Sequence, residues 1–315
     1  MLTFISKAST LLRIVVGIQL SIALLIAYKT PWSSLSGSLN WFVFTVSAVV
    51  AFFALRFVIV ALQFGISFVA GSPTPYSSRL GFFGALHTFW NEATASFSAF
   101  VWRMPFTPYL PMTQTTQASK KLAVLLVHGY GCNRAMWLKF SRGLALHGYA
   151  SEAINLEPPL GSIDDYPALI EIGLKALIAN TGAEQIAIVA HSMGGLAIRA
   201  FLSVSTPEQN ERIFKVITLG TPHQGTVHAA LGQGKNTHQM RRKSAWRDEL
   251  AARERPTDIA KLVCILTHHD NIVAPQASQT VAGAKTIELY GIGHVALAYS
   301  DEVLQLVINE LQDFH

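Results

Sequence analysis

One stretch decides the fold of this chain: Ile188-Val189-Ala190-His191-Ser192-Met193-Gly194-Gly195-Leu196. Its apolar beginning is typical of a buried strand, and its end is typical of a helix. A serine lies between them, with a small residue two positions before it, Ala190, and two positions after it, Gly194. Small residues at these places allow a tight, strained strand-to-helix turn that exposes the serine hydroxyl at the start of a helix. We therefore predict that Ser192 is a nucleophile, with a serine in an ordinary glycine-rich turn as the alternative.

Apolar runs of strand length recur on both sides of this turn, from residue 121 to the end of the chain. We predict strands at 122–127, 150–155, 185–189, 214–219, 261–267 and 285–290. Helical patterns fit between them, and strands that alternate with helices form a parallel sheet with helices on both faces. In such sheets, sites form where the strands end at their carboxyl edge.

Polar residues with complementary chemistry follow three of the other predicted strands. The first strand leads into His128-Gly129-Tyr130, the fifth is followed by Asp270, and the sixth by His294. A serine hydroxyl is a weak nucleophile, so it needs an imidazole base, and the imidazole needs a carboxylate that fixes its tautomer. The strand ends predict this combination of Ser192, His294 and Asp270 at one edge of the sheet. We expect His128 to hold its loop rather than to react.

These motifs, in their order along the chain, resemble the α/β-hydrolase superfamily, and in particular its bacterial lipases and esterases. The stretch Gly220-Thr221-Pro222-His223-Gln224-Gly225 is similar to a segment common in those enzymes. The serine turn of the family usually reads Gly-x-Ser-x-Gly, and Ala190 replaces the first glycine here. The resemblance covers about residues 120–315, and it does not cover the N-terminal part of the chain.

The resemblance implies a fold and a set of roles. It implies an α/β-hydrolase fold in which Ser192 attacks an acyl carbon, His294 is the general base and Asp270 orients His294. It also implies that the backbone amides of Tyr130 and Met193 form the oxyanion hole. No cofactor is expected for this chemistry.

A metal site is an alternative, because the chain has 11 histidines. His268, His269 and Asp270 make a ligand set if His223 or His294 joins them. The chain lacks the His-Glu-x-x-His spacing of a zinc-binding helix. We therefore expect no metal.

A long insertion, residues 223–258, follows the fourth predicted strand. It has glycine-rich ends and a cationic stretch, Gln239-Met240-Arg241-Arg242-Lys243-Ser244-Ala245-Trp246. Two interpretations stay open: a lid that covers the acyl pocket, or a solvated charged surface. Basic residues beside Met240 and Trp246 are also typical of a segment that binds an anionic membrane surface.

Composition separates the first 110 residues from the rest of the chain. Across the 315 residues, 50% are hydrophobic and only 14% are charged, with a mean hydropathy of +0.34, whereas about 25% are charged in a typical soluble domain. Residues 1–110 hold six Lys or Arg and one acid, Glu92, so this part carries the whole net charge of +5. The pI near 9.2 therefore does not indicate a nucleic-acid partner. Cations beside apolar runs are instead typical of membrane proteins.

Two apolar runs, 11–28 and 41–70, are long enough to cross a bilayer. A helix of 18 residues is about 27 Å long, close to the roughly 30 Å hydrocarbon core. We predict a transmembrane helical hairpin within residues 1–75, with a secretory signal or a buried soluble core as the alternatives. Arg56 is costly inside a bilayer: it snorkels, pairs within an oligomer, or lies outside a span whose bounds differ from these.

Residues 76–119 are expected to hold an amphipathic helix followed by a Pro/Thr-rich linker. Apolar residues recur there at helical spacing, and Glu92 lies off their stripe. The stripe consists of Phe83, Leu86, Phe89 or Trp90, Ala93, Phe97 and Phe100. Two interpretations stay open: the helix lies in the bilayer surface, or it packs on the predicted hydrolase domain, residues 120–315.

The cations also predict an orientation. Lys7 and Arg13 precede or begin the first span. Arg79 and Arg103 follow the second span, and Lys29 lies between the two. Because the more cationic side is normally cytoplasmic, we expect a multi-pass protein of the inner membrane with its catalytic domain in the cytoplasm.

Together these predictions describe a membrane-anchored serine hydrolase that cleaves carboxylic esters. The membrane anchor and the apolar helix favour lipid acyl esters as substrates. The same three residues serve acyltransferases and thioesterases, so both stay open. A non-catalytic binding protein with a hydrolase fold is less favoured, because all three residues are present. The expected partners are therefore an ester substrate and the bilayer, and no nucleic acid.

Overall fold

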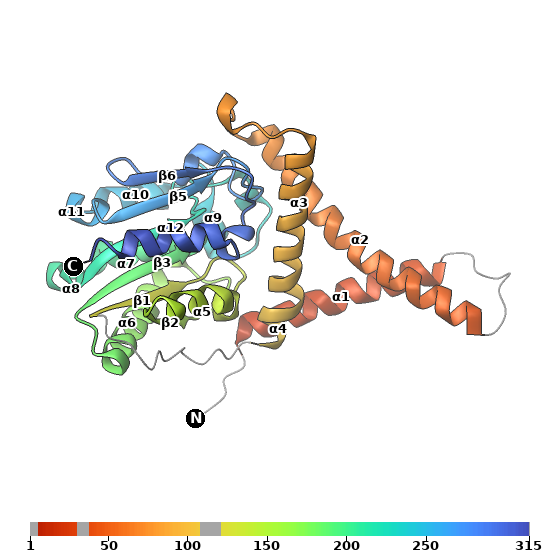
Figure 1. The fold of residues 1–315 in the computed structure, drawn as a ribbon, viewed down its shortest axis with the longest axis horizontal. Helices are drawn as coiled ribbons and strands as arrows, with labels where there is room; N and C mark the ends of the chain where they lie inside the picture. The colour runs from red at the N-terminus through yellow and green to blue at the C-terminus, as the bar shows by residue number, and fades with distance from the viewer. Residues whose placement is uncertain (1–5, 30–37, 108–120, 315) are drawn as a thin grey trace.

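The computed structural model describes residues 6–29, 38–107 and 121–314 of the chain. It contains a layered domain built on a parallel sheet, from residue 121 onwards, and an assembly of helices formed by the residues before it (Figure 1). Most of the predicted linker, at 108–119, lies outside the described residues.

Six strands form one sheet in the order β2-β1-β3-β4-β5-β6, and each neighbouring pair is parallel. The strands are β1 Leu122–Val127, β2 Ala150–Ile154, β3 Gln185–His191, β4 Ile213–Leu219, β5 Leu262–Thr267 and β6 Lys285–Leu289. Each lies where the sequence predicts a strand, with ends that differ by at most two residues. Every residue of β1 is buried, as expected for a parallel strand that is covered on both faces.

Helices cover both faces of the sheet. On one face, α5 (Leu138–Leu146) and α12 (Asp301–Leu311) share a core with Leu122, Val124 and Leu126 of β1. The other face is covered by three helices: α6 Pro167–Thr181, α7 Met193–Val204 and α10 Ala245–Arg253. The shorter helices of this domain are α8 Pro207–Glu211, α9 Lys235–Met240 and α11 Pro256–Ile259. The predicted arrangement of helices on both faces is confirmed.

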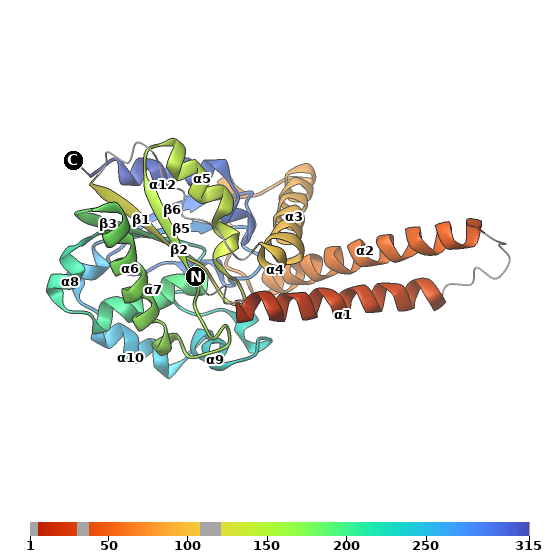
Figure 2. The ribbon, with the colours of Figure 1, turned by 90° about the horizontal axis from the view of Figure 1, so that it is seen from below.

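Two long helices project from the sheet domain as a hairpin (Figures 1 and 2). They are α1 (Lys7–Lys29) and α2 (Ser38–Ala70), and both are long and apolar enough to cross a membrane. Large apolar side chains along them are exposed, among them Ile18, Leu25 and Phe42. A helix in a soluble core hides such side chains, so the alternative of a buried core does not fit.

Helix α2 is much longer than a bilayer span. Its 33 residues extend over about 50 Å at 1.5 Å per residue, against a hydrocarbon core of roughly 30 Å. Arg56 lies about 27 Å along the helix from Ser38 by the same rise. Beside it, Phe57 already stacks on Trp90 of the next helix, with 5.4 Å between the ring centroids. The apolar run 41–70 is therefore longer than a single crossing needs, and Arg56 lies beside the residues of α2 that pack on α3.

Helix α3 (Phe82–Phe97) lies across the base of the hairpin (Figure 1) and continues through a π-helical turn, Ser98–Arg103, into α4, Met104–Phe106. Its polar side faces the sheet domain, where Glu92 is fully buried. Its apolar side packs in part on α2, where Trp90 stacks on Phe57, and is otherwise exposed, with Phe83 81% exposed. The helix therefore packs on the next domain, as one interpretation requires, and still presents an apolar surface, as the other requires.

Buried polar contacts join the helical assembly to the sheet domain. The side-chain amide of Asn133, in the loop after β1, donates to Ser9 Oγ (2.9 Å) and to the Met104 carbonyl (2.8 Å). The Ser9 hydroxyl donates to the same carbonyl at 2.8 Å. All three residues are buried. Because buried polar groups are costly to leave without partners, these contacts fix α1 and α4 on the domain.

Candidate active site

The turn between β3 and α7 has the strained backbone that the sequence predicts. Ser192 has φ 56° and ψ −129°, and a residue with a side chain in such a conformation costs on the order of 1–3 kcal/mol. A Cβ on Gly194 would lie 2.7 Å from the carbonyl oxygens of Val127 and His128. The turn therefore needs a glycine at this position, because any side chain would collide with the end of β1.

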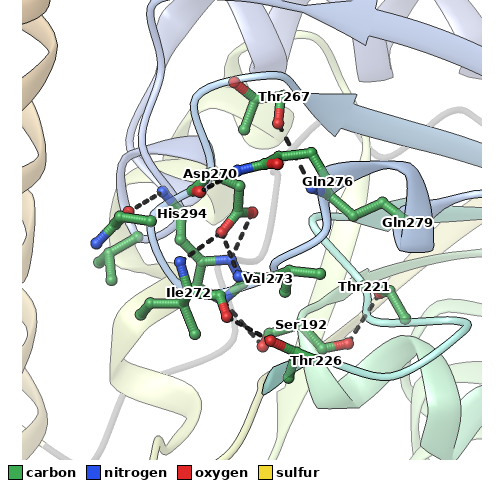
Figure 3. Close-up of polar contacts among 12 residues, drawn as sticks. Ser192, Thr221, Thr226, Thr267, Asp270, Ile272, Val273, Gln276, Gln279 and His294 are labelled. Carbon is green, nitrogen blue, oxygen red and sulfur yellow. Dashed lines mark hydrogen bonds and ion pairs between the residues drawn. The ribbon is translucent and has the colours of Figure 1, made fainter. Parts of the chain in front are cut away.

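Three side chains from separate strand ends meet at this turn (Figure 3). His294 Nε2 lies 2.9 Å from Ser192 Oγ, and His294 Nδ1 lies 2.8 Å from Asp270 Oδ2. Ser192 follows β3, Asp270 follows β5 and His294 follows β6. Asp270 and His294 are almost fully buried. The structure thus brings the three predicted residues together in one hydrogen-bonded chain.

The hydrogen bonds of Asp270 fix the tautomer of His294. Asp270 Oδ1 accepts the backbone N–H groups of Ile272 (2.8 Å) and Val273 (2.6 Å), which leaves Oδ2 for the imidazole. The carboxylate accepts the Nδ1–H of His294, so Nε2 carries the lone pair that accepts the Ser192 hydroxyl. In this tautomer the imidazole is placed to take the Ser192 proton.

The surroundings of His294 favour its protonated form. Burial alone lowers the pKa of His294, but the Asp270 carboxylate, its hydrogen bond and the more distant Glu92 carboxylate outweigh burial and raise this pKa above 6.5. The His191 ring lies 4.6 Å from the His294 ring between centroids. Burial and the neighbouring His294 lower the pKa of His191 to about 3. His191 is therefore a neutral ring, whose Nε2–H donates to the His294 carbonyl at 2.9 Å.

The loop after β1 lies directly against the serine. A Cβ on Gly129 would lie 2.7 Å from Ser192 Cβ. His128 holds this loop: its Nδ1–H donates to the Gly129 carbonyl (2.9 Å), and its Nε2 accepts the Leu156 N–H (3.0 Å). Burial lowers the pKa of His128 to about 4, which agrees with a neutral ring. The expected structural role of His128 fits these contacts.

Two residues, Tyr130 and Met193, are predicted for the oxyanion hole. Tyr130 follows Gly129 in the loop after β1, and Met193 is the first residue of α7. The Tyr130 hydroxyl donates to the Gln233 carbonyl (2.9 Å) and accepts the Gln233 N–H (3.1 Å). The loop is therefore held by Gln233 of the insertion on one side and by the side chain of His128 on the other.

A family model described as the alpha/beta hydrolase fold matches residues 123–257, which include the first four strands and the serine turn. Residues 121–314 form an α/β-hydrolase fold. Among solved structures similar to the chain, a mature lipase of Bacillus licheniformis has a TM-score of 0.54 at 16% identity and covers 64% of this chain and 96% of its own. Lipase B of Aspergillus fumigatus has a TM-score of 0.55 at 18% identity, with coverage of 65% and 55%. At these identities the likeness shows the fold alone.

Two relatives named triacylglycerol lipase match part of the chain. The one from Pseudarthrobacter phenanthrenivorans is 29% identical over 126 residues, which cover 36% of this chain and 37% of the relative. The one from Burkholderia plantarii is 29% identical over 126 residues, with coverage of 36% and 33%. The match therefore spans about a third of each relative's length. It supports a lipase- or esterase-like α/β hydrolase.

The histidines of the alternative metal set have other partners in the hydrolase domain. His223 Nε2 lies 3.0 Å from Thr218 Oγ1, and His268 Nε2 lies 2.8 Å from a carboxylate oxygen of Glu288. His269 Nδ1 accepts a backbone N–H from the loop after β6 at 3.0 Å. In the part of the chain that the structure describes, no group of three or more His, Cys, Asp or Glu side chains is arranged to hold a metal ion. The alternative ligand set is thus not assembled.

The insertion at 223–258 is anchored to the hydrolase domain through its cationic stretch. Met240 is buried in the core on the α6/α7 face of the sheet. Trp246 is partly buried, and its Nε1–H donates to Asp164 at 2.8 Å. Met240 and Trp246 therefore face the domain rather than a membrane surface. The cations between them, at 242–243, are exposed, which fits a solvated charged surface and leaves them free to contact an anionic one.

Three side chains of the N-terminal helices reach the site without having been assigned to it from the sequence. Ser67 Oγ donates to the Asp270 carbonyl at 2.6 Å, and Gln63 Oε1 accepts from Asn271 Nδ2 at 3.0 Å. Glu92 accepts the backbone N–H groups of the two residues that follow His294. The sequence held a signal for them, because a polar residue in an apolar helix is costly without a partner.

Proposed function

We propose that this protein is a membrane-anchored serine hydrolase that cleaves carboxylic esters, with lipid acyl esters as its substrates. The hydrogen-bonded chain from Ser192 through His294 to Asp270 carries the proposal. A serine with only a structural role needs neither a strained backbone nor a buried imidazole–carboxylate pair beside its hydroxyl. The likeness to lipases supports the same class of reaction.

The proposed reaction proceeds through an acyl-enzyme. His294 Nε2 takes the proton of Ser192 as the hydroxyl oxygen attacks the ester carbonyl carbon, and Asp270 stabilises the imidazolium. The backbone amides of Tyr130 and Met193 donate to the oxyanion of the tetrahedral intermediate. The imidazolium returns the proton to the leaving alcohol. Water then attacks the acyl-enzyme with the same base and releases the carboxylic acid.

The choice of lipid esters rests on the apolar surfaces beside the site. Helix α3 contacts the backbone beyond His294 on its polar side, and it exposes Phe83, Leu86 and Trp90 on its other side. Exposed apolar surfaces of this extent are typical of contact with a membrane or a partner. An acyl chain held in a bilayer has a short path to a site that borders such a helix.

Purified full-length protein in detergent micelles is expected to hydrolyse p-nitrophenyl esters with a rate that depends on pH. His294 accepts the Ser192 proton only when it is neutral, and its pKa lies above 6.5. Activity is therefore expected at pH values above this pKa and is lost as the pH falls through it. The measurement is kcat/KM between about pH 5 and 9. A rate that does not fall on the acid side contradicts the role of His294.

The products distinguish the hydrolase from the two alternatives. Ester formation in the presence of a competing alcohol identifies an acyltransferase, and faster cleavage of acyl-thioesters identifies a thioesterase.

We propose that α1 and α2 cross the inner membrane and that α3 lies on its cytoplasmic surface. Arg13 and Arg56 lie toward the domain end of the hairpin, and Lys29 lies at its other end, as cations do at the two borders of a hydrocarbon core. The protein is expected to stay in the membrane pellet after alkaline carbonate extraction, and a C-terminal reporter is expected to be active only in the cytoplasm. Release by carbonate contradicts the spanning helices, and a periplasmic reporter contradicts the orientation.

A further inference from the structure

We propose that Glu92 of helix α3 is a positioning residue for His294: it holds the loop that carries the imidazole and stabilises the imidazolium by its charge. The inference rests on the proposed serine-hydrolase function. It assigns to the N-terminal helices a part in the reaction itself, besides anchoring.

The Glu92 carboxylate contacts the backbone on both sides of His294. Its Oε1 accepts the N–H of Val295 at 3.0 Å, and its Oε2 accepts the N–H of Ala296 at 2.9 Å. On the other side, a Cβ on Gly293 would lie 2.5 Å from Glu92 Oε2. The carboxylate therefore lies directly on the Gly293 backbone, and residue 294 is the one between these contacts.

The remaining polar groups of this backbone are also held, so the loop has one defined position. The His294 N–H donates to Asn271 Oδ1 at 2.9 Å, and the His294 carbonyl accepts from His191 Nε2 at 2.9 Å. Val295 is buried, so its N–H has little access to water if the carboxylate is lost. Without the Glu92 carboxylate, the N–H groups of Val295 and Ala296 lose their acceptor. The loop is then expected to change its conformation so that these groups reach another acceptor.

Glu92 is itself fixed by complete burial, with 0% of its side chain exposed. Burial raises the pKa of the Glu92 carboxyl, and the two backbone N–H groups act against this rise. Because both oxygens accept N–H protons, the bonds favour the ionised carboxylate. The titratable groups near His294 are Asp270, Glu92, His191 and His228, and Glu92 is the second carboxylate that raises the pKa of His294.

The position of Glu92 on α3 links the site to the apolar surface of that helix. Glu92 faces the hydrolase domain, whereas Phe83 and Trp90 of the same helix are exposed. Helix α2 contacts the other loop in the same manner, through Ser67 and the Asp270 carbonyl at 2.6 Å. Both loops that complete the site are thus held by helices outside the hydrolase domain.

The test compares Glu92→Gln and Glu92→Asp with Thr88→Val in the full-length protein. Glutamine keeps the size of the side chain, removes the charge and points a donor at one of the two N–H groups. Aspartate keeps the charge and shortens the reach. Thr88 is a matched control, because it is buried on α3 one turn earlier and its hydroxyl donates within the helix, to the Gly84 carbonyl at 2.8 Å.

Glu92→Gln is expected to lower kcat by about 10- to 100-fold, as small misplacements of a reacting group do, with little change in KM. The acid limb of its pH profile, where kcat/KM falls as the pH is lowered, is expected to shift to lower pH. The reason is that loss of the negative charge lowers the pKa of His294. Glu92→Asp is expected to keep the acid limb of the wild type with a reduced kcat. Thr88→Val is expected to match the wild type in both.

Glu92→Gln with the wild-type kcat and the wild-type acid limb overturns the inference. A lower melting temperature with both parameters unchanged per folded molecule also overturns it, because Glu92 then has a structural role alone. A wild type that neither hydrolyses esters nor reacts with a fluorophosphonate probe overturns the proposed function first, and this inference with it.

Discussion

Ser192→Ala is expected to abolish ester hydrolysis, with kcat reduced by about 10⁴- to 10⁶-fold, as when the nucleophile of a serine hydrolase is removed. The Ser192 hydroxyl makes its contact with His294 at 2.9 Å, and alanine leaves that imidazole with nothing to deprotonate. The fold is expected to remain, because the methyl group of alanine fits where the serine Cβ lies. Initial rates on p-nitrophenyl esters, together with the melting temperature, measure both effects.

Ser203→Ala is the matched control for this variant. Ser203 lies on α7, the helix that begins at the turn, and its hydroxyl donates to the Ala200 carbonyl at 2.8 Å. The control is expected to retain wild-type kcat and KM. Ser192→Ala with more than about a hundredth of the wild-type rate contradicts the assignment of the nucleophile, because residual catalysis without one is far smaller.

Asp270→Asn is expected to lower kcat by about 10⁴-fold through the tautomer of His294. The backbone N–H groups of Ile272 and Val273 donate to Asp270 Oδ1, so the asparagine carbonyl oxygen takes that position. The asparagine NH₂ group then faces His294 Nδ1 and donates to it, which places the imidazole proton on Nε2. In that tautomer Nε2 has no lone pair for the Ser192 proton.

Asp258→Asn is the control for the loss of a buried carboxylate. Asp258 is buried, pairs with Arg255 at 2.6 Å and accepts from Asn210 at 3.0 Å. This variant is expected to lose stability but to keep its activity per folded molecule. Asp270→Asn with a kcat within tenfold of the wild type, measured on folded protein, contradicts the role of the carboxylate.

The chemistry at the strand ends was predictable from local sequence, because each residue follows a strand that its own pattern defines. The turn around Ser192 needs small residues at fixed positions, and the parallel sheet places the ends of β3, β5 and β6 at one edge. The meeting of Ser192, Asp270 and His294 follows from those two facts. Their distances do not, since they depend on how each loop packs.

The contribution of the N-terminal helices was not predictable in the same way. Glu92 lies 203 residues from its partner Val295, and no local pattern links positions so far apart. Glu92 lies off the apolar stripe of its helix, and that pattern does not say which surface its side faces; the structure turns it toward the hydrolase domain. What the sequence did contain was a single acid within residues 1–110, and a lone charge in an apolar segment calls for a partner.

The long apolar runs of the hairpin were predictable but their contacts with α3 were not, because hydropathy alone does not distinguish lipid from protein surroundings. The apolar run continues to residue 70, yet the second half of α2 packs on α3 through ring contacts such as Phe57–Trp90 and Phe53–Phe97. Arg56 lies among these residues of α2.

The central claim is that the hydroxyl of Ser192 is activated by His294, and covalent labelling tests it most directly. Full-length protein in membranes, treated with a fluorophosphonate probe and digested, is expected to carry one adduct, on Ser192, as located by mass spectrometry. The adduct is expected to disappear in Ser192→Ala and to form far more slowly in His294→Ala. Folded wild-type protein that stays unlabelled, or that carries its adduct on another residue, contradicts the account.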